Sequence, residues 1–171
     1  MLNFEIRPSN SADFEQMFEI WVQSQKQATG KRTDEPSEMK DCFRKLFFDT
    51  PLAHFYVAES TSMQIVGWQA LLPLISNPNI GRYTAQSSTY VSRDFLANDL
   101  GSRLFEHAIA DAKRLGIDHV YAWVKTDNEA ANSIAERFRK HRFEIPGTDG
   151  RLPDFYLYIV AADEYPHIVT Q

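Results

Sequence analysis

The sequence has little of several features that mark particular classes of protein. It contains a single cysteine, Cys42, which excludes an internal disulfide framework and a cysteine-based zinc cluster. Acidic residues outnumber basic ones by 23 to 18, giving a formal net charge of −5, so we expect no nucleic-acid partner bound through counterion release. The most apolar stretch, residues 65–75, includes Gly67, Gln69 and Pro73 and is far too short to span a membrane.

Metal ligands and targeting signals are scarce as well. None of the five histidines pairs with another at the spacing of metal ligands, so no metal site is expected. The first eight residues carry Glu5 and Arg7 and lack the apolar run of a secretory leader. We therefore expect a cytoplasmic protein that has no membrane partner.

The composition that is present is that of an ordinary globular protein. Of the 171 residues, 43% are hydrophobic, 13% are aromatic and 24% are charged, which is typical of a chain that folds around its own core. A chain of this length corresponds to one domain. No repeat or linker divides it, so we expect a single domain over residues 1–171.

Hydrophobic periodicity predicts alternating strands and helices. The region 76–81 is expected to be a loop, and the last helix is expected to continue through the basic run that ends at Arg142. Tryptophans 21, 68 and 123 and Cys42 are expected in the core, although Trp68 could instead line a pocket for an acceptor. The order predicts a mixed α/β sheet with helices on both faces, from strands over 4–7, 54–59, 64–72, 83–91, 119–125, 143–145 and 155–161, and helices over 14–22, 36–48, 100–114 and 131–138.

The segment 90–105 is the strongest candidate for a functional site. A strand runs into a short polar loop, and the loop opens a strongly amphipathic helix. Backbone N–H groups at the start of a helix have no partner within the helix and lie at its positive end, which suits a phosphate or pyrophosphate. Gly101 would permit close approach of the backbone to such a group. The alternative is a plain turn in which Asp99 caps the helix.

Four short motifs, together with the order of the elements, resemble the GCN5-related N-acetyltransferase (GNAT) superfamily. Within it, the residues of 86–91 and 100–102 most resemble phosphinothricin-type acetyltransferases. The resemblance implies a mixed, mostly antiparallel sheet of six to seven strands, with about four helices on both faces and a splayed central strand pair. The motifs are Ile-Val-Gly-Trp at 65–68, Gln-Ser-Ser-Thr-Tyr-Val at 86–91, the loop 96–102, and Val-Lys-Thr-Asp-Asn-Glu-Ala-Ala at 124–131.

The same resemblance implies an acetyl-CoA-dependent N-acetyltransferase that acts on a small primary amine. The amine would attack the thioester directly, and the backbone N–H of Val91 would polarise the thioester carbonyl. The pantetheine arm would lie between the splayed strands, and Asn128 would lie near this arm. Relatives are often dimers, so a homodimer is one expectation. The pyrophosphate would be cradled by the backbone of Leu96, Ala97, Asn98, Asp99, Leu100, Gly101 and Ser102.

The sequence departs from the family pattern in this loop, which usually reads Gln/Arg-x-x-Gly-x-Gly/Ala. Leu96 replaces the polar first residue and Asp99 replaces the first glycine. A carboxylate about 5 Å from a pyrophosphate would weaken binding by on the order of 1 kcal/mol. Arg93 and Arg103 are the nearest cations that could compensate.

The expected catalytic positions depart as well. Gln86 stands where phosphinothricin-type enzymes have a glutamate base, and Ala135 stands where the superfamily often has a tyrosine acid. An amide cannot take up a proton at neutral pH, but Gln86 could orient a water or the substrate. Tyr90, beside Val91, is the best-placed alternative hydroxyl. The other possibility is a non-catalytic acyl-CoA-binding or regulatory module on a degenerate GNAT fold.

Overall fold

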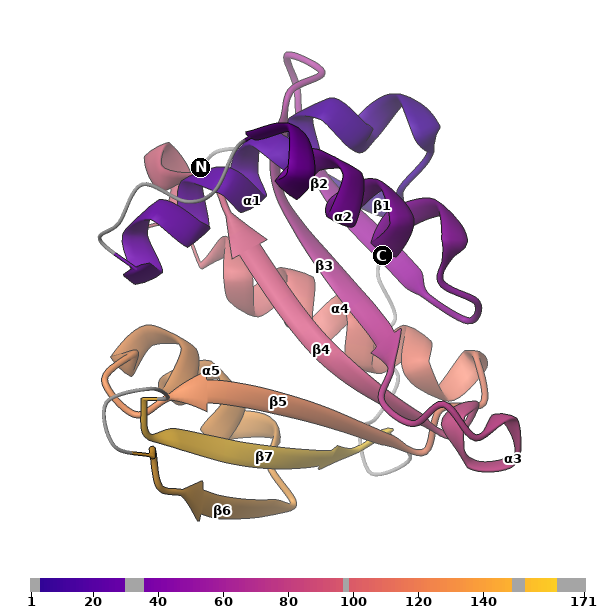
Figure 1. The fold of residues 1–171 in the computed structure, drawn as a ribbon, viewed down its shortest axis with the longest axis vertical. Coiled ribbons are helices and arrows are strands. Elements are labelled where there is room, and N and C mark those ends of the chain that lie inside the picture. The colour runs from indigo at the N-terminus through magenta and orange to yellow at the C-terminus, as the bar shows by residue number, and fades with distance from the viewer. Residues whose placement is uncertain (1–3, 30–35, 97–98, 149–152, 163–171) are drawn as a thin grey trace. The chain divides into compact units, whose positions relative to one another are not determined.

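The computed structural model describes residues 4–29, 36–96, 99–148 and 153–162. Its seven strands are hydrogen-bonded in the order β1-β2-β3-β4-β5-β7-β6 (Figure 1). The strands are β1 (Phe4–Pro8), β2 (His54–Ser60), β3 (Ile65–Pro73), β4 (Thr84–Val91), β5 (His119–Lys125), β6 (His141–Ile145) and β7 (Phe155–Ala161). The α-helices are α1 (Phe14–Thr29), α2 (Pro36–Asp49), α3 (Pro78–Gly81), α4 (Leu100–Arg114) and α5 (Glu129–Phe138), and the 3₁₀ turns are η1 (Ser11–Asp13) and η2 (Arg93–Phe95).

Strand directions confirm the predicted mixed, mostly antiparallel sheet. Strand β1 pairs antiparallel with β2, and β7 pairs antiparallel with both β5 and β6. Strands β4 and β5 run parallel, as expected for strands joined through a long helix. No helix in the described part of the chain is long and apolar enough to cross a membrane.

The chain divides into two compact units, and β3, β4 and α4 each pass from one to the other. The first unit contains Met1–Ala70 and Thr89–Phe105, and the second contains Leu71–Ser88 and Glu106–Gln171. Each unit has its own buried residues. The expectation of one domain over 1–171 stays a prediction.

An aromatic cluster forms much of the core of the first unit. The Phe43 ring on α2 lies 5.5 Å from the rings of both Phe14 on α1 and Trp68 on β3. Trp68 is only 1% exposed, and its indole Nε1 donates to the carbonyl of Met17 at 3.0 Å. Trp68 is therefore a core residue with a satisfied polar atom.

The start of α1 is held by a charged capping arrangement. Asn10 caps the η1 turn, and the Asp13 carboxylate accepts from the Asn10 backbone N–H at 2.8 Å. Arg7 on β1 donates to both Asp13 oxygens, at 2.8 and 2.9 Å, and to Glu59 on β2 at 2.7 Å. These bonds tie the first strand pair to the beginning of α1.

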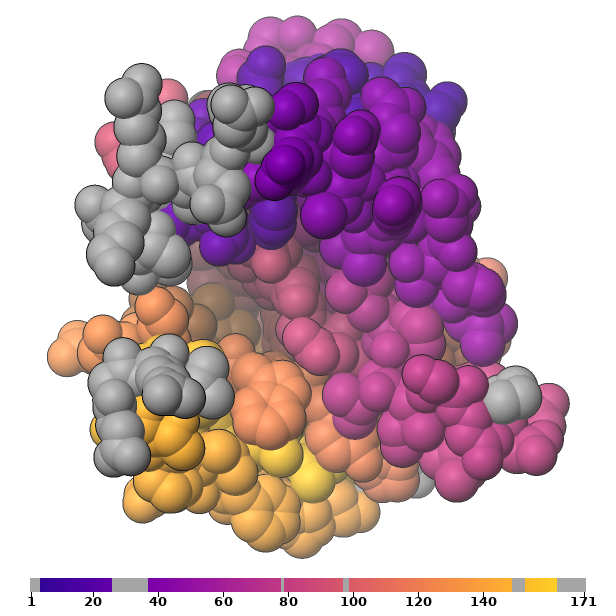
Figure 2. Space-filling model, viewed as in Figure 1, coloured from indigo at the N-terminus to yellow at the C-terminus, as the bar shows by residue number. Residues whose placement is uncertain are grey.

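In the second unit, α5 packs against β5 and β7 (Figure 1). The register runs from His119 opposite Ala161 to Lys125 opposite Phe155. Alternate β5 residues, among them Val120 and Val124, are buried, as the two-residue repeat of a strand requires. Figure 2 shows the orange-to-gold atoms of β5 to β7 together on the visible surface.

Several expectations about individual segments and residues are wrong. The expected loop at 76–81 contains α3, because Asn77 caps it and a proline occupies its first turn. The last helix ends at Phe138 instead of continuing through Arg142, because His141–Ile145 pairs with β7 as β6. Cys42 is exposed, beside the buried Phe43 on α2. Trp123 is 43% exposed, since it lies on the open side of β5.

Candidate functional site

The end of β4 lies in the first unit, beside β3. Tyr90 stacks on Trp68 with ring centroids 4.3 Å apart, and the Thr89 hydroxyl donates to the Gln69 side chain. Directly after β4, the Ser92 N–H donates to the Val66 carbonyl of β3 at 2.9 Å. In these contacts, higher residue numbers on β4 face lower residue numbers on β3, so the two strands are antiparallel here.

This register determines the direction of the Val91 N–H. Neighbouring residues of a strand direct their N–H groups to opposite edges. Because the Ser92 N–H is bonded to β3, the Val91 N–H is directed away from β3. Gly67 lies opposite this point, and a Cβ added there would be 3.1 Å from the Tyr90 carbonyl oxygen. Glycine at 67 therefore allows the two strands to approach closely.

The turn between β4 and α4 has an unusual backbone at Asp99. Its φ of +53° lies in the left-handed region, which glycine adopts freely and Asp or Asn tolerate better than most residues. The Asp99 carbonyl accepts the helical hydrogen bond of Arg103 at 3.1 Å. Leu96 is 58% exposed, and Ala97 and Asn98 lie outside the described residues.

The first turn of α4 has the backbone required for anion binding. Leu100 and Ser102 are 1% and 0% exposed, so packing fixes the position of this turn. The N–H groups of residues 100–102 come before Arg103, whose N–H makes the first helical hydrogen bond, to the Asp99 carbonyl, and they lie at the positive end of the helix. The exposed carboxylate of Asp99 precedes them and opposes an anion.

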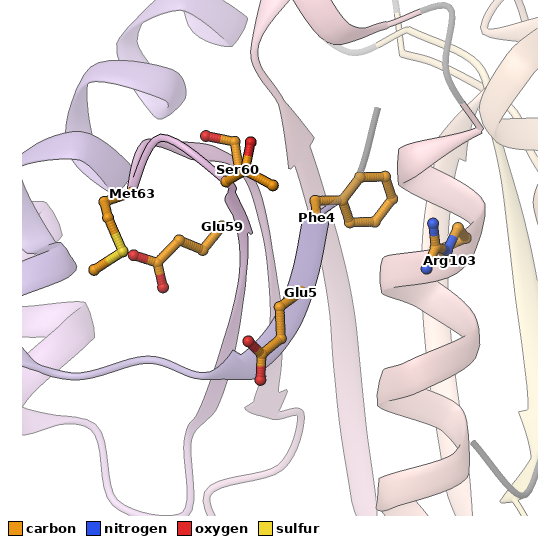
Figure 3. Close-up of a pocket in the computed structure, with 7 residues that line it drawn as sticks. Phe4, Glu5, Glu59, Ser60, Met63 and Arg103 are labelled. Carbon is orange, nitrogen blue, oxygen red and sulfur yellow. The ribbon is translucent and has the colours of Figure 1, made fainter. Parts of the chain in front are cut away.

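Arg103, in the first turns of α4, directs its guanidinium toward β1. Its guanidinium lies over the Phe4 ring, 4.1 Å from the centroid, a cation–π arrangement. Figure 3 shows Arg103 on α4 facing Phe4. The two side chains line a cavity of about 400 Å³ together with Glu5, Glu59, Ser60, Thr61 and Met63. Apart from Arg103, none of the predicted site residues that the structure describes lines this cavity.

Gln86 and Asn128 belong to the second unit and are far apart along the sheet. Gln86 is half-buried on β4 and pairs with Tyr121 of β5. Asn128 follows the end of β5 at Lys125, and the four residues from Tyr121 to Lys125 span about 13 Å.

The parallel pairing of β4 and β5 is short. It runs from Thr84 opposite His119 to Ser87 opposite Ala122. The next residues of the two strands are Ser88 and Trp123, both among the described residues, and they are not paired with each other. At its other edge, β5 stays paired with β7 over its whole length, from His119 to Lys125.

Asn128 caps α5. Its side-chain oxygen accepts from the Ala131 backbone N–H at 3.1 Å, which satisfies one of the unpaired donors of the first turn. Because the Asn128 side-chain oxygen faces α5, the side-chain nitrogen is directed away from the helix. Asn128 is exposed to solvent. Asn128 thus presents a hydrogen-bond donor at the end of β5.

Ala135 and Glu136 lie further along α5. Ala135 is buried and has no proton to donate. Burial opposes the ionisation of Glu136, but hydrogen bonds and charges from Arg139 and Arg142 prevail and lower its pKa. Glu136 is thus an ionised structural residue that joins α5 to β6. In the described part of the chain, no three acidic, histidine or cysteine side chains are grouped to hold a metal.

Comparisons with known proteins place this arrangement in a family. Residues 14–139 match the profile of the Acetyltransferase (GNAT) family. A search of curated proteins finds no match.

Solved structures share the fold. A Salmonella typhimurium protein assigned as an acetyltransferase, solved with its cofactor acetyl-CoA, superimposes with a TM-score of 0.76 at 22% identity, covering 96% of each chain. A protein assigned as a phosphinothricin N-acetyltransferase superimposes with a TM-score of 0.72 at 22% identity, covering 93% of this chain and 98% of its own. An N-acetyltransferase from Staphylococcus aureus Mu50 superimposes with a TM-score of 0.74 at 18% identity, covering 94% of this chain and 99% of its own. The family match over residues 14–139 shows that the chain belongs to the GNAT acetyltransferases, enzymes whose acyl donor is acetyl-CoA.

Proposed function

We propose that this chain transfers the acetyl group of acetyl-CoA to a small primary amine by direct attack of the amine on the thioester. The observation that supports it most is the geometry of the β4–α4 connection. There, the Val91 N–H is directed away from β3, and a left-handed residue precedes the buried first turn of a helix. This backbone offers one donor for a carbonyl and several for a pyrophosphate.

The Val91 N–H is the proposed electrophilic group. As the amine nitrogen bonds to the carbonyl carbon, negative charge develops on the carbonyl oxygen, and a fixed N–H donor stabilises that charge. The C–S bond then breaks and the thiolate leaves. Because the donor belongs to the backbone of a strand, it needs no reorganisation during the reaction.

Binding of the donor is assigned to two places in the chain. The backbone of residues 96–102, including Ala97 and Asn98, would hold the pyrophosphate, and the outward amide nitrogen of Asn128 would donate to the pantetheine arm. The backbone fits this group, since Asp99, at the position of the family's glycine, has a left-handed backbone that glycine adopts freely. The Leu96 and Asp99 side chains fit it less well, and we infer weaker binding than in relatives with the full motif.

Two side chains are proposed to assist the proton transfers. The Tyr90 hydroxyl would return a proton to the leaving thiolate, since its backbone adjoins Val91 and its ring is held against Trp68. Gln86 would orient the amine or a water, and water would take up the proton that the amine nitrogen loses as the amide forms. With no strong base, most of the rate enhancement would come from orienting a neutral amine beside the thioester.

The test is release of free thiol from acetyl-CoA in the presence of a panel of small primary amines, with the acetylated product identified by mass spectrometry. We expect transfer to at least one amine, and we expect Tyr90→Phe to lower kcat while leaving the affinity for acetyl-CoA within about twofold. Binding of acetyl-CoA with no transfer to any amine would support the alternative, a non-catalytic acyl-CoA-binding or regulatory module. The absence of a tyrosine at Ala135 is the observation that favours this alternative.

A further inference from the structure

The Asn132 side chain bridges two carbonyls at the end of β5. Its amide nitrogen donates to the carbonyl oxygens of Lys125 at 3.0 Å and Thr126 at 3.2 Å. Lys125 is the last residue of β5, and Thr126 begins the turn toward α5. Asn132, on the second turn of α5, thus clamps the helix to the strand end that precedes it.

Tyr158 determines which way the Asn132 amide points. From β7, its hydroxyl donates to the Asn132 side-chain oxygen at 2.9 Å. An amide has one accepting and one donating end, so the reversed orientation would set its oxygen against two carbonyls and its nitrogen against the hydroxyl hydrogen. Tyr158 is fully buried, and burial together with the nearby Glu136 charge raises its pKa, so the hydroxyl stays protonated.

The same turn carries Asn128. The Asn128 N–H donates to the Lys125 carbonyl at 3.0 Å, and the Asn128 carbonyl accepts from the Asn132 N–H at 2.9 Å. The Asn128 side chain bonds to Ala131 N–H in the first turn of α5. Helix ends fray readily, so the direction of the exposed Asn128 amide depends on how firmly this turn is held.

We propose that Asn132 and Tyr158 are positioning residues for acetyl-CoA binding that act through Asn128. This inference rests on the proposed function, which assigns Asn128 to the pantetheine arm. The chain of contacts runs from the buried Tyr158 hydroxyl to the Asn132 amide, to the carbonyls of residues 125 and 126, and to the exposed Asn128. Neither Asn132 nor Tyr158 needs to touch the ligand itself.

The first test measures acetyl-CoA affinity and steady-state kinetics for Tyr158→Phe and Asn132→Leu. Loss of one hydrogen bond corresponds to about a 2- to 13-fold change in an equilibrium constant, and we expect Kd and KM for acetyl-CoA to rise within that range. The kcat at saturation should stay within about twofold, because Asn128 does not touch the reacting carbonyl. The double variant should be no weaker than Asn132→Leu, since both changes break one pathway.

Tyr156→Phe is the matched control. It removes the same hydroxyl from the same strand two residues away, and Phe keeps a ring under the Arg142 guanidinium, which lies 4.8 Å from the Tyr156 ring. Its acetyl-CoA affinity should equal that of the unmodified chain. A KM that rises equally in Tyr156→Phe and Tyr158→Phe, or in neither, would overturn the positioning role.

A second readout needs no ligand. Amide hydrogen exchange at Asn128 and Ala131 should be faster in Tyr158→Phe and Asn132→Leu than in Tyr156→Phe, because the first turn of α5 opens more often. Unchanged exchange would refute the clamp, and faster exchange with unchanged affinity would refute its role in binding. Failure of the unmodified chain to bind acetyl-CoA would overturn the proposed function, and the positioning role with it, while the exchange data would still decide whether the clamp exists.

Discussion

Asp99 combines two properties at one position, a left-handed backbone and a negative charge. Its φ of +53° is the conformation that explains why the family loop has glycine there. The two properties can be separated by substitution. Asp99→Asn removes the charge and keeps a side chain that tolerates this backbone, whereas Asp99→Gly also removes the strain.

We expect both Asp99 variants to bind acetyl-CoA more tightly. Removing a carboxylate about 5 Å from a pyrophosphate should gain on the order of 1 kcal/mol, or about fivefold in Kd, at low salt. Titration at two salt concentrations is the measurement, since screening should reduce the gain. Unchanged affinity in Asp99→Asn would show that no phosphate lies beside this residue.

Gly67 permits the close contact of β3 with the end of β4. In Gly67→Ala the new Cβ would lie 3.1 Å from both the Tyr90 carbonyl oxygen and a Leu104 methyl, and 3.2 Å from a Leu100 methyl. Overpacking of this kind lowers stability by about 1–3 kcal/mol, and it should displace Val91. We expect Gly67→Ala to lower the urea midpoint and kcat. Unchanged stability and activity would show that β3 and β4 can move apart without affecting either property.

Gln86 occupies the position of the family's glutamate base, so Gln86→Glu tests whether a base is missing. General-base catalysis contributes about 10²- to 10⁴-fold, and even poor alignment should raise kcat/KM about tenfold. The gain should appear as pH rises through the pKa of the new carboxyl, because only the carboxylate accepts a proton. A pH profile with no gain would place residue 86 away from the amine.

At the residue scale, local signals could be found in the sequence and distant contacts could not. The motif comparison singled out Asp99, and the structure adds the reason why glycine is usual there. Asn132 went unnoticed because its partner Tyr158 is 26 residues away, and only the fold brings them together. The single hint was its place four residues after Asn128, one helical turn along.

At the element scale, periodicity predicted most of the strands and helices. It failed where a capping residue or pairing with a distant strand determines the secondary structure. Strands β5 and β7 begin and end as expected, because an apolar two-residue repeat with polar ends is a strong local signal. Helix α3 is too short to show any periodicity. The basic run at 139–142 resembles a helix end, but pairing with β7 makes its last two residues a strand.

The junction of β1, β2 and α1 predicts a pH-dependent stability. Hydrogen bonds from Arg7 lower the pKa of Asp13 in the folded state. This stabilisation is therefore complete above the ordinary carboxyl pKa of about 4, and it is lost as pH falls through the lower folded value. Urea unfolding should show a free energy that falls between pH 5 and pH 2, and the fall should be smaller in Asp13→Asn.

The same substitution measures the strength of the junction at neutral pH. Asp13→Asn should lower the free energy of unfolding by about 2–3 kcal/mol, because it removes charged hydrogen bonds at a buried position. The matched control is Glu15→Gln, which breaks the exposed pair with Lys40 and should change stability by less than about 1 kcal/mol. Equal effects of the two substitutions would contradict the role given to Asp13.

At the scale of the whole molecule, the family and the fold could be predicted from the sequence more fully than the site. The order of elements reflects periodicity along the entire chain, and it led to the GNAT fold that the family match over 14–139 supports. The residues proposed to hold the donor are spread along the chain, at Val91, at residues 96–102 and at Asn128. Their affinity for the donor depends on charges and backbone angles that motif matching does not measure.

Binding of acetyl-CoA to the full chain is the most direct test of the central claim. Calorimetric titration should show one site per chain, and saturating acetyl-CoA should raise the melting temperature, since a ligand that binds only the folded state stabilises it. Val91 and residues 99–102 should show the largest changes in backbone amide shifts. Neither heat nor a melting shift at millimolar acetyl-CoA would contradict the account.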